Sequence, residues 1–141
     1  MGFLPELWDL FVEHREELTT NKALMCLAPD VERYRRLQEM GLLHSLIATR
    51  GEEIVGYSIN VIDTSLHYKD VTFFTNDVLF LSEGNREGFA GIKLIRATES
   101  LARREGADMV MWHAKSGTNL AKILHRWGYA VQDIIYSKEL I

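Results

Sequence analysis

The sequence predicts a mixed α/β or α+β fold in which a central β-sheet carries helices on both faces. Three observations lead to this prediction: two amphipathic helical patterns at the beginning, β-rich segments in the middle, and alternating strand and helix patterns towards the end. A strand, a helix and another strand in sequence imply a right-handed crossover between parallel neighbours, whereas a hairpin joins antiparallel ones. The sheet is therefore expected to be mixed.

Two helices are expected first. Residues 5–18 place apolar side chains at helical spacing, and Pro5 falls in the first turn, where proline is tolerated. A second helix is expected over residues 31–40, because Asp30 can cap its beginning and Gly41 can end it.

The period then changes to that of strands. Residues 46–49 and 54–62 are rich in β-formers, and Arg50, Gly51 and Glu52 between them indicate a hairpin. Residues 71–81 form a further strand that is nearly apolar on both faces near its end. Such a pattern is typical of a central strand that is covered on both sides.

The last part of the chain alternates between the two periods. A long helix is expected over residues 89–105, a strand over 109–114, a short helix that Gly128 ends, and one or two strands over 129–140. The predicted order is therefore ααβββαβαβ. No linker or internal repeat interrupts it, so residues 1–141 are expected to form one domain.

Composition narrows the classes of function. The chain has 141 residues, of which 47% are hydrophobic and 26% charged, with a formal net charge of -4. This charge does not favour nucleic-acid binding. No apolar run approaches the roughly 20 residues that span a bilayer, and no signal peptide is recognised. With a single cysteine no intrachain disulfide can form, which favours a cytoplasmic location.

The turn between the central strand and the long helix is the first candidate site. Residues 84–91 read GNREGFAG, a glycine-rich connection with one arginine before a helix N-terminus. Unpaired N–H groups and the helix dipole favour an anion there. A plain strand-to-helix connection is the alternative, and Gly91 also suits close packing of the helix on the sheet. Neither GxxxxGK[ST] nor GxGxxG is present.

The whole pattern resembles the GNAT superfamily of CoA-dependent N-acetyltransferases over nearly all of the chain. Arg86, Gly91 and Leu94 match the family's turn, Arg/Gln-x-x-Gly-x-Gly/Ala with a leucine three residues on, although Phe89 stands where the middle glycine is usual. Residues 128–129 match its Gly-Phe/Tyr. A few shorter matches also resemble a branch common in phages and prophages.

The resemblance implies a sheet of about six or seven strands and a site for acetyl-CoA, with no metal. It places the pyrophosphate on backbone N–H groups of Glu87, Gly88, Phe89, Ala90 and Gly91 with Arg86 nearby, and pantetheine on the backbone of Phe80, Leu81 and Ser82. A backbone N–H near residues 79–81 would polarise the thioester carbonyl.

Acetyl transfer to an amine also needs a base, because an alkylammonium with a pKa of about 10.4 must first lose a proton. Asp77 is the first candidate, since an aspartate in an apolar strand would have a raised pKa; a hydrogen-bonded or arginine-paired aspartate is the alternative. His67 and His113 are the other catalytic candidates. The alternatives are that His67 is an exposed loop histidine and that His113 is a histidine of the core. Asp63 and Tyr68 are candidates for binding the acceptor.

The family's usual acid, a tyrosine four residues before the helix-ending glycine, is Leu124 here, so no general acid is assigned. The predicted function is an N-acetyltransferase acting on a small-molecule or protein amine. A catalytically silent GNAT-fold module that binds acyl-CoA or a protein is the alternative, and a nucleotide-binding domain without CoA is a weaker one. No nucleic-acid or membrane partner is expected, and a homodimer is left open.

Overall fold

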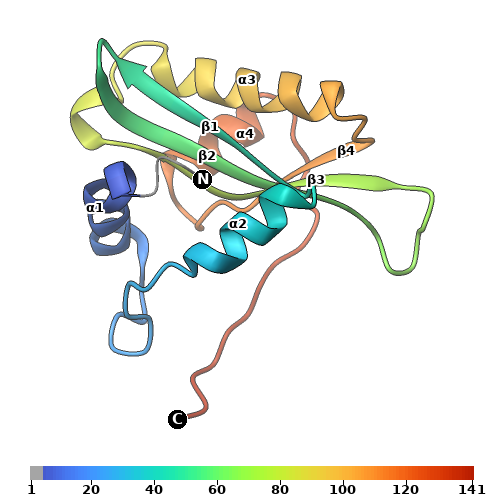
Figure 1. Ribbon diagram of the computed structural model, residues 1–141, viewed down its shortest axis with the longest axis horizontal. Helices are drawn as coiled ribbons and strands as arrows, with labels where there is room; N and C mark the ends of the chain where they lie inside the picture. Colours follow the sequence, from blue (N-terminus) through green and yellow to red (C-terminus); the bar gives the residue numbers. More distant parts are fainter. Residues whose placement is uncertain (1–4) are drawn as a thin grey trace.

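The computed structural model describes residues 5–141 (Figure 1). Its helices are α1 (Trp8–Leu18), α2 (Val31–Glu39), α3 (Ala90–Arg104) and α4 (Asn119–Arg126), with short 3-10 turns η1 (Pro5–Leu7) and η2 (Glu83–Asn85). The strands are β1 (Leu43–Arg50), β2 (Glu53–Thr64), β3 (Thr72–Leu81) and β4 (Met109–Trp112). The sheet order is β1-β2-β3-β4; β3 and β4 are parallel and the other pairs antiparallel, so the predicted mixed sheet is confirmed.

Local sequence signals explain where several elements begin and end. The Asp30 side chain accepts a hydrogen bond of 2.9 Å from the Arg33 N–H and so caps α2, as predicted. Gly41 follows α2 with a φ of 73°, and Gly51 has a φ of 62° between β1 and β2. Both glycines adopt a left-handed conformation that other residues rarely adopt, which fixes these two reversals.

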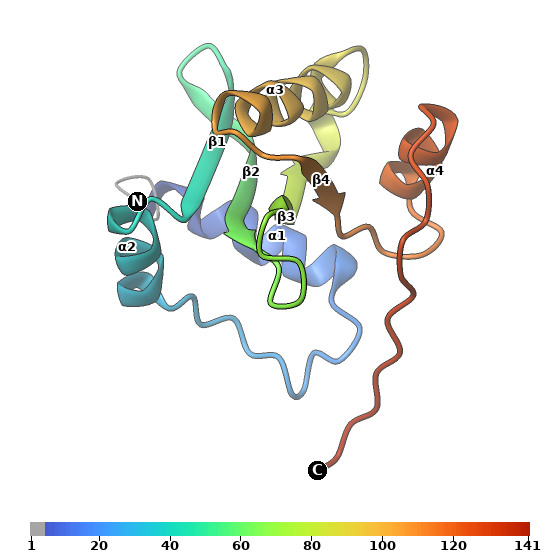
Figure 2. The same cartoon turned by 90° about the vertical axis from the view of Figure 1, so that its right-hand side faces the viewer.

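Helices cover both faces of the sheet, as predicted (Figure 2). On the face of α1 and α2, one apolar cluster joins helix and strand residues: Leu7, Leu10, Phe11, Leu43, Tyr57, Ile59 and Phe80. On the opposite face α3 packs against β2, where the Thr98 and Ser58 hydroxyls lie 2.9 Å apart. The core beneath α3 is therefore partly polar.

The predicted number of strands is wrong. Residues 5–141 contain four strands rather than six or seven, and residues 129–141 form none. The expected strand over 129–140 has β-forming residues, but a strand also needs a partner edge, and this segment runs away from the sheet (Figure 1). Its one backbone hydrogen bond is from the Tyr129 N–H to Leu124 O, at the end of α4.

The two parallel strands separate along their length. Residues 73–76 of β3 pair with residues 109–112 of β4, where β4 ends. Strand β3 continues to Leu81, so its residues 77–81 have β2 on one side and no strand on the other within the described residues. This open edge leads directly to the turn before α3.

Candidate functional site

The open edge of β3 presents backbone groups that no neighbouring strand uses. The Ser82 N–H donates to Val55 O of β2 at 2.8 Å. Because successive residues of a strand direct their N–H and C=O to alternate sides, Leu79 and Leu81 direct theirs to the open edge. Leu81 is one of the residues predicted to contact pantetheine, and Leu79 lies in the range predicted to polarise the thioester. Phe80 and Ser82 direct their backbone groups to β2 instead, so the prediction that they contact pantetheine is wrong.

The turn that follows leaves a row of amides unpaired. No side chain caps α3 at Phe89, and within residues 5–141 the N–H groups from Glu87 to Gly91 have no hydrogen-bond acceptor. Gly88 has a φ of 78°, which suits glycine, while a Cβ at Gly91 would meet nothing within 4 Å. Gly91 therefore leaves open space beside the amides, and the alternative that it packs closely against the sheet is wrong.

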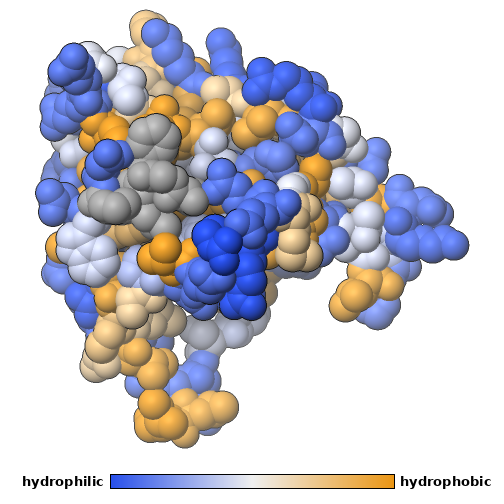
Figure 3. All heavy atoms as spheres, viewed as in Figure 1, coloured by the Kyte–Doolittle hydropathy of each residue, from blue (hydrophilic) through white to orange (hydrophobic). Residues whose placement is uncertain are grey.

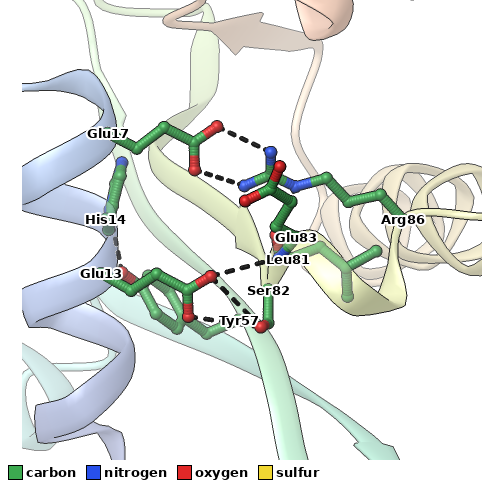
Figure 4. A network of polar contacts seen from close by, with 8 residues as sticks. All are labelled: Glu13, His14, Glu17, Tyr57, Leu81, Ser82, Glu83 and Arg86. Atoms are coloured by element: carbon green, nitrogen blue, oxygen red, sulfur yellow. Dashed lines mark hydrogen bonds and ion pairs between the residues drawn. The ribbon is translucent and has the colours of Figure 1, made fainter.

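Arg86 does not point freely towards this turn. Its Nη1 and Nη2 donate to the two carboxylate oxygens of Glu17 at 2.6 and 2.5 Å, and its Nε donates to Leu81 O at 2.7 Å (Figure 4). The guanidinium also lies over the Phe80 ring, 5.4 Å from its centroid. These contacts lower the pKa of the Glu17 carboxyl, chiefly through the hydrogen bond from Arg86. Arg86 thus joins helix α1 to the end of β3.

A second carboxylate of α1 makes a parallel contact. The Glu13 carboxylate accepts from the Ser82 hydroxyl and from the Glu83 N–H, each at 3.2 Å (Figure 4). Sequence reasoning assigned no role to Glu13 or Glu17. Their spacing of four residues on one helix face is the signal that could have shown that they act together.

His14 lies between these carboxylates and the core. Its Nδ1 is 2.8 Å from the Tyr57 hydroxyl, and its ring stacks on Phe80 at a centroid distance of 4.8 Å. Burial lowers the pKa of the His14 imidazole, and the Glu17 carboxylate opposes part of this shift. Burial also raises the pKa of the Tyr57 hydroxyl. His14 is therefore neutral near pH 7 and held beside the expected pantetheine strand.

Asp77 occupies a different position from the predicted one. The register pairs Asn60 with Asn76 and Ile59 with Val78, which leaves Asp77 as the additional residue of a β-bulge. The bulge turns Asp77 outwards, where it is exposed, so the burial expected for it is wrong. Asn76 is instead the buried polar residue and donates to Ser58 and Asn60.

The other predicted residues are divided between two ends of the sheet. His113 follows β4 directly, where the two parallel strands separate, and is exposed. His67 and Tyr68 are exposed in the β2–β3 loop and line an open depression there. Asp63 of β2 is exposed and pairs with Phe73 of β3. Phe73 lies eight residues before Leu81 on the same strand, a distance of about 26 Å. The structure therefore does not bring Asp63, His67 and Tyr68 to the turn.

Comparisons with known proteins were made for sequence and for structure. No protein-family model and no curated protein matches the sequence. Among solved structures, an aminoglycoside acetyltransferase from an uncultured soil metagenomic sample, in complex with sisomicin, is 18% identical; the match covers 99% of this chain and 89% of that chain with a TM-score of 0.74.

Two further structures match at similar length. A ribosomal-protein-alanine N-acetyltransferase from Brucella melitensis biovar Abortus 2308 is 16% identical over 99% of this chain and 92% of that chain, with a TM-score of 0.70. A transcriptional regulator from Bacillus halodurans C-125 is 14% identical over 97% and 95%, with a TM-score of 0.78. These identities show a shared fold, and they give no support to a phage-associated branch.

Proposed function

The chain has the fold of the GNAT acetyltransferases, and from this premise we propose that it transfers an acetyl group from acetyl-CoA to a primary amine. The observation that carries the proposal is that the open edge of β3 is followed, after the short turn η2, by the unpaired amides before α3. Acetyl-CoA has an extended arm with amide groups, which matches the strand edge, and a diphosphate, which matches the unpaired amides.

The residues of the site fit such a co-substrate in order along the chain. Leu79 offers its N–H and C=O, and Leu81 its N–H, for the amides of the arm to pair with as an added strand would; the Leu81 C=O is taken by Arg86. Residues 87–91 offer N–H groups and the positive end of the α3 dipole for the diphosphate. When bound, acetyl-CoA would supply the thioester whose carbonyl carbon the amine attacks, and in this proposal the Leu79 N–H polarises that carbonyl.

The unpaired amides, rather than Arg86, are the main anion site in this proposal. The guanidinium of Arg86 is already paired with Glu17, and its Nε is bonded to Leu81 O. Arg86 therefore holds the backbone that carries the amides in place, and its positive charge adds to the attraction of the diphosphate without direct contact.

His14 is the base that the geometry favours. In the tautomer with hydrogen on Nδ1, the Tyr57 hydroxyl accepts that hydrogen, and the lone pair of Nε2 is free to take a proton from the ammonium. The amine then forms the C–N bond as the C–S bond breaks, and the nitrogen of the new amide loses its remaining extra proton to water. The sulfur leaves as a thiolate, since Leu124 is buried and has no proton to give. Asp77, exposed on the bulge, is the second candidate base.

A catalytically silent binding module is the second candidate function. Two observations favour it: Leu124 stands where many of the family carry a tyrosine, and a structure described as a transcriptional regulator has a TM-score of 0.78 with this chain. The module and the enzyme share acyl-CoA binding and differ in turnover.

The test uses Gly91, where a side chain has room. Gly91→Asp places a carboxylate beside the amides, and an acidic residue in the first turn suits the helix itself. We expect calorimetric titration to show acetyl-CoA binding to the unaltered chain and at least about tenfold weaker binding to Gly91→Asp. Gly91→Asn, of matched size without charge, should lose much less.

Release of free CoA over a panel of small-molecule and protein amines then separates the two functions. Turnover with any amine supports the enzyme, whereas tight binding with no turnover supports the module. Unaltered acetyl-CoA binding by Gly91→Asp would contradict both.

A further inference from the structure

Four polar side chains are buried where α3 packs against the sheet: Ser58 and Asn60 of β2, Asn76 of β3 and Thr98 of α3. Each of them is 0% exposed, whereas hydrophilic residues cover much of the surface seen in Figure 3. A buried polar group costs free energy unless it is hydrogen-bonded. The hydrogen-bond partners of these side chains therefore show what each one contributes to the fold.

Asn76 acts in this group through its amide nitrogen. The Nδ2 atom lies 2.8 Å from Asn60 Oδ1, 3.1 Å from Ser58 Oγ and 3.1 Å from Val78 O. Because a backbone carbonyl can only accept, the bond to Val78 O fixes which end of the amide is the nitrogen. The Asn76 Oδ1 atom, by contrast, is buried without a partner among the described residues, which is costly. The nitrogen is therefore the part of this side chain that contributes to the structure.

The bond from Asn76 to Val78 O crosses the β-bulge, whose additional residue is Asp77. Val78 pairs with Ile59, so its C=O lies on the β2 side of the strand. The next N–H along the chain, that of Leu79, lies on the opposite side, at the open edge. Val78 C=O and Leu79 N–H belong to one peptide group, which is planar and trans. A bond that holds the oxygen therefore also sets the direction of the Leu79 N–H.

The backbone alone constrains this peptide group less than one in the middle of the sheet. Strand β4 ends at Trp112, opposite Asn76, so beyond that point β3 has only β2 as a neighbour within the described residues. The bulge interrupts the regular pairing with β2 at the same place. The side-chain bond from Asn76 thus adds a constraint where two backbone constraints are reduced.

We propose that Asn76 is a positioning residue for acetyl transfer: its amide nitrogen holds the Val78 carbonyl and thereby directs the Leu79 N–H at the thioester carbonyl. A hydrogen bond to the oxygen of a peptide group also polarises that group, which makes the Leu79 N–H a better donor. Asn76 is fully buried and touches neither co-substrate nor amine, so it acts through this one peptide group. The inference rests on the proposed function, because the Leu79 N–H has this role only if the acyl-CoA arm lies along the open edge of β3.

Amide NMR of the ¹⁵N-labelled chain tests the claim at Leu79 itself. In the unaltered chain the Leu79 N–H signal should move further with acetyl-CoA than with CoA, because only acetyl-CoA has the thioester carbonyl. In Asn76→Ala this difference should be lost, while the signals of residues 87–91 shift as before. Asn76→Thr keeps most of the side-chain volume but has no amide, so it should give the same result with a smaller cavity.

Thr98→Val is the matched control, because Thr98 belongs to the same buried group but has no hydrogen bond to β3. With an amine that gives turnover, Asn76→Ala should lower kcat by about 10- to 100-fold, since a donor to the developing oxyanion is misdirected rather than removed. Its affinity for acetyl-CoA should be nearly unchanged. Thr98→Val should leave both quantities nearly unchanged.

Two kinds of failure are distinguishable in these experiments. Equal losses of kcat from Asn76→Ala and Thr98→Val, or a response of Leu79 to acetyl-CoA that survives both changes at Asn76, would overturn the role of Asn76 alone. Shifts at residues 87–91 without any response of Leu79 specific to acetyl-CoA in the unaltered chain would do the same. An absence of shifts at residues 87–91 with either ligand would reject the proposed acyl-CoA site, and this inference with it.

Discussion

Two regions of the molecule differ in how their polar groups are paired and their apolar side chains are buried: the end of β3 beside α1, called the closed end, and the region beyond β4, called the open end. At the end of β3, helix α1 supplies Glu13, His14 and Glu17, and each of them has a hydrogen-bond partner across the structure. Beyond β4, the C-terminal segment and the strand edge have no such partner among the described residues. The difference is that the first end is closed by contacts within the chain, whereas the second leaves a strand edge and an extended segment unpaired within the described residues.

The largest expected effect is on folding stability at the closed end. Phe80 is 2% exposed and contacts His14, Tyr57 and Arg86. Phe80→Ala should cost about 3–5 kcal/mol of unfolding free energy in urea, because it leaves a cavity in the main apolar cluster. This loss should be the same at every protein concentration.

Ile135→Ala is the matched change at the open end. Ile135 is 78% exposed, so this change should cost less than about 0.5 kcal/mol. A loss from Ile135→Ala as large as that from Phe80→Ala would remove the distinction between the two ends.

Next in size is the effect of His14 on turnover. His14→Asn keeps a polar atom near the Tyr57 hydroxyl but removes Nε2, so kcat should fall by about 10²- to 10⁴-fold with acetyl-CoA affinity unchanged. Asp77→Asn is the comparison and should change kcat only slightly. The reverse result, with Asp77→Asn inactive and His14→Asn active, would identify Asp77 as the base.

The pH dependence of kcat/KM should report the same group. Burial lowers the pKa of His14 below its ordinary 6.5, so activity should be full above pH 6.5 and be lost as the pH falls through the lower folded value. Glu17 and Asp77 raise this pKa, and Arg86 and Lys115 lower it. Glu17→Gln should therefore move the acid limb to lower pH; a shift to higher pH would contradict the assignment.

A small effect on stability is expected at the Arg86–Glu17 pair. Both side chains are more than a third exposed, at 35% and 37%, so solvent screens their attraction. Glu17→Gln should cost no more than about 1 kcal/mol, and less at high salt. Since its partner lowers the pKa of Glu17, this contribution is present above pH 4.5 and is lost as the pH falls through the lower folded value. A larger, salt-independent loss would indicate a role in the core.

Much of the fold could be predicted from local patterns. Helices α1–α4 follow from apolar spacing and from caps such as Asp30, and the β1–β2 hairpin from Gly51. The final strand could not be decided in this way, because β-forming residues make a strand only where the path of the chain brings them to a partner edge. The separation of β3 and β4 follows from their register, which pairs only residues 73–76 with residues 109–112.

The site was less predictable because it depends on register and on distant contacts. A single additional residue at the bulge exchanged the roles of Asn76 and Asp77, and alternation alone does not reveal a bulge. The bond between Arg86 and Glu17 joins residues 69 positions apart in the sequence, so neither residue indicates its partner. The turn of residues 84–91 was recognisable because its glycines and the following helix are adjacent in sequence.

The most direct measurement is an amide NMR titration of the ¹⁵N-labelled chain with CoA. The account predicts that the largest shifts fall on the N–H groups of residues 87–91 and of Leu79 and Leu81, with much smaller ones in the β2–β3 loop around His67. Saturation without shifts at residues 87–91, or no binding up to about 1 mM, the range of weak ligand affinities, would contradict the claim that the open edge of β3 and the α3 amides form one acyl-CoA site.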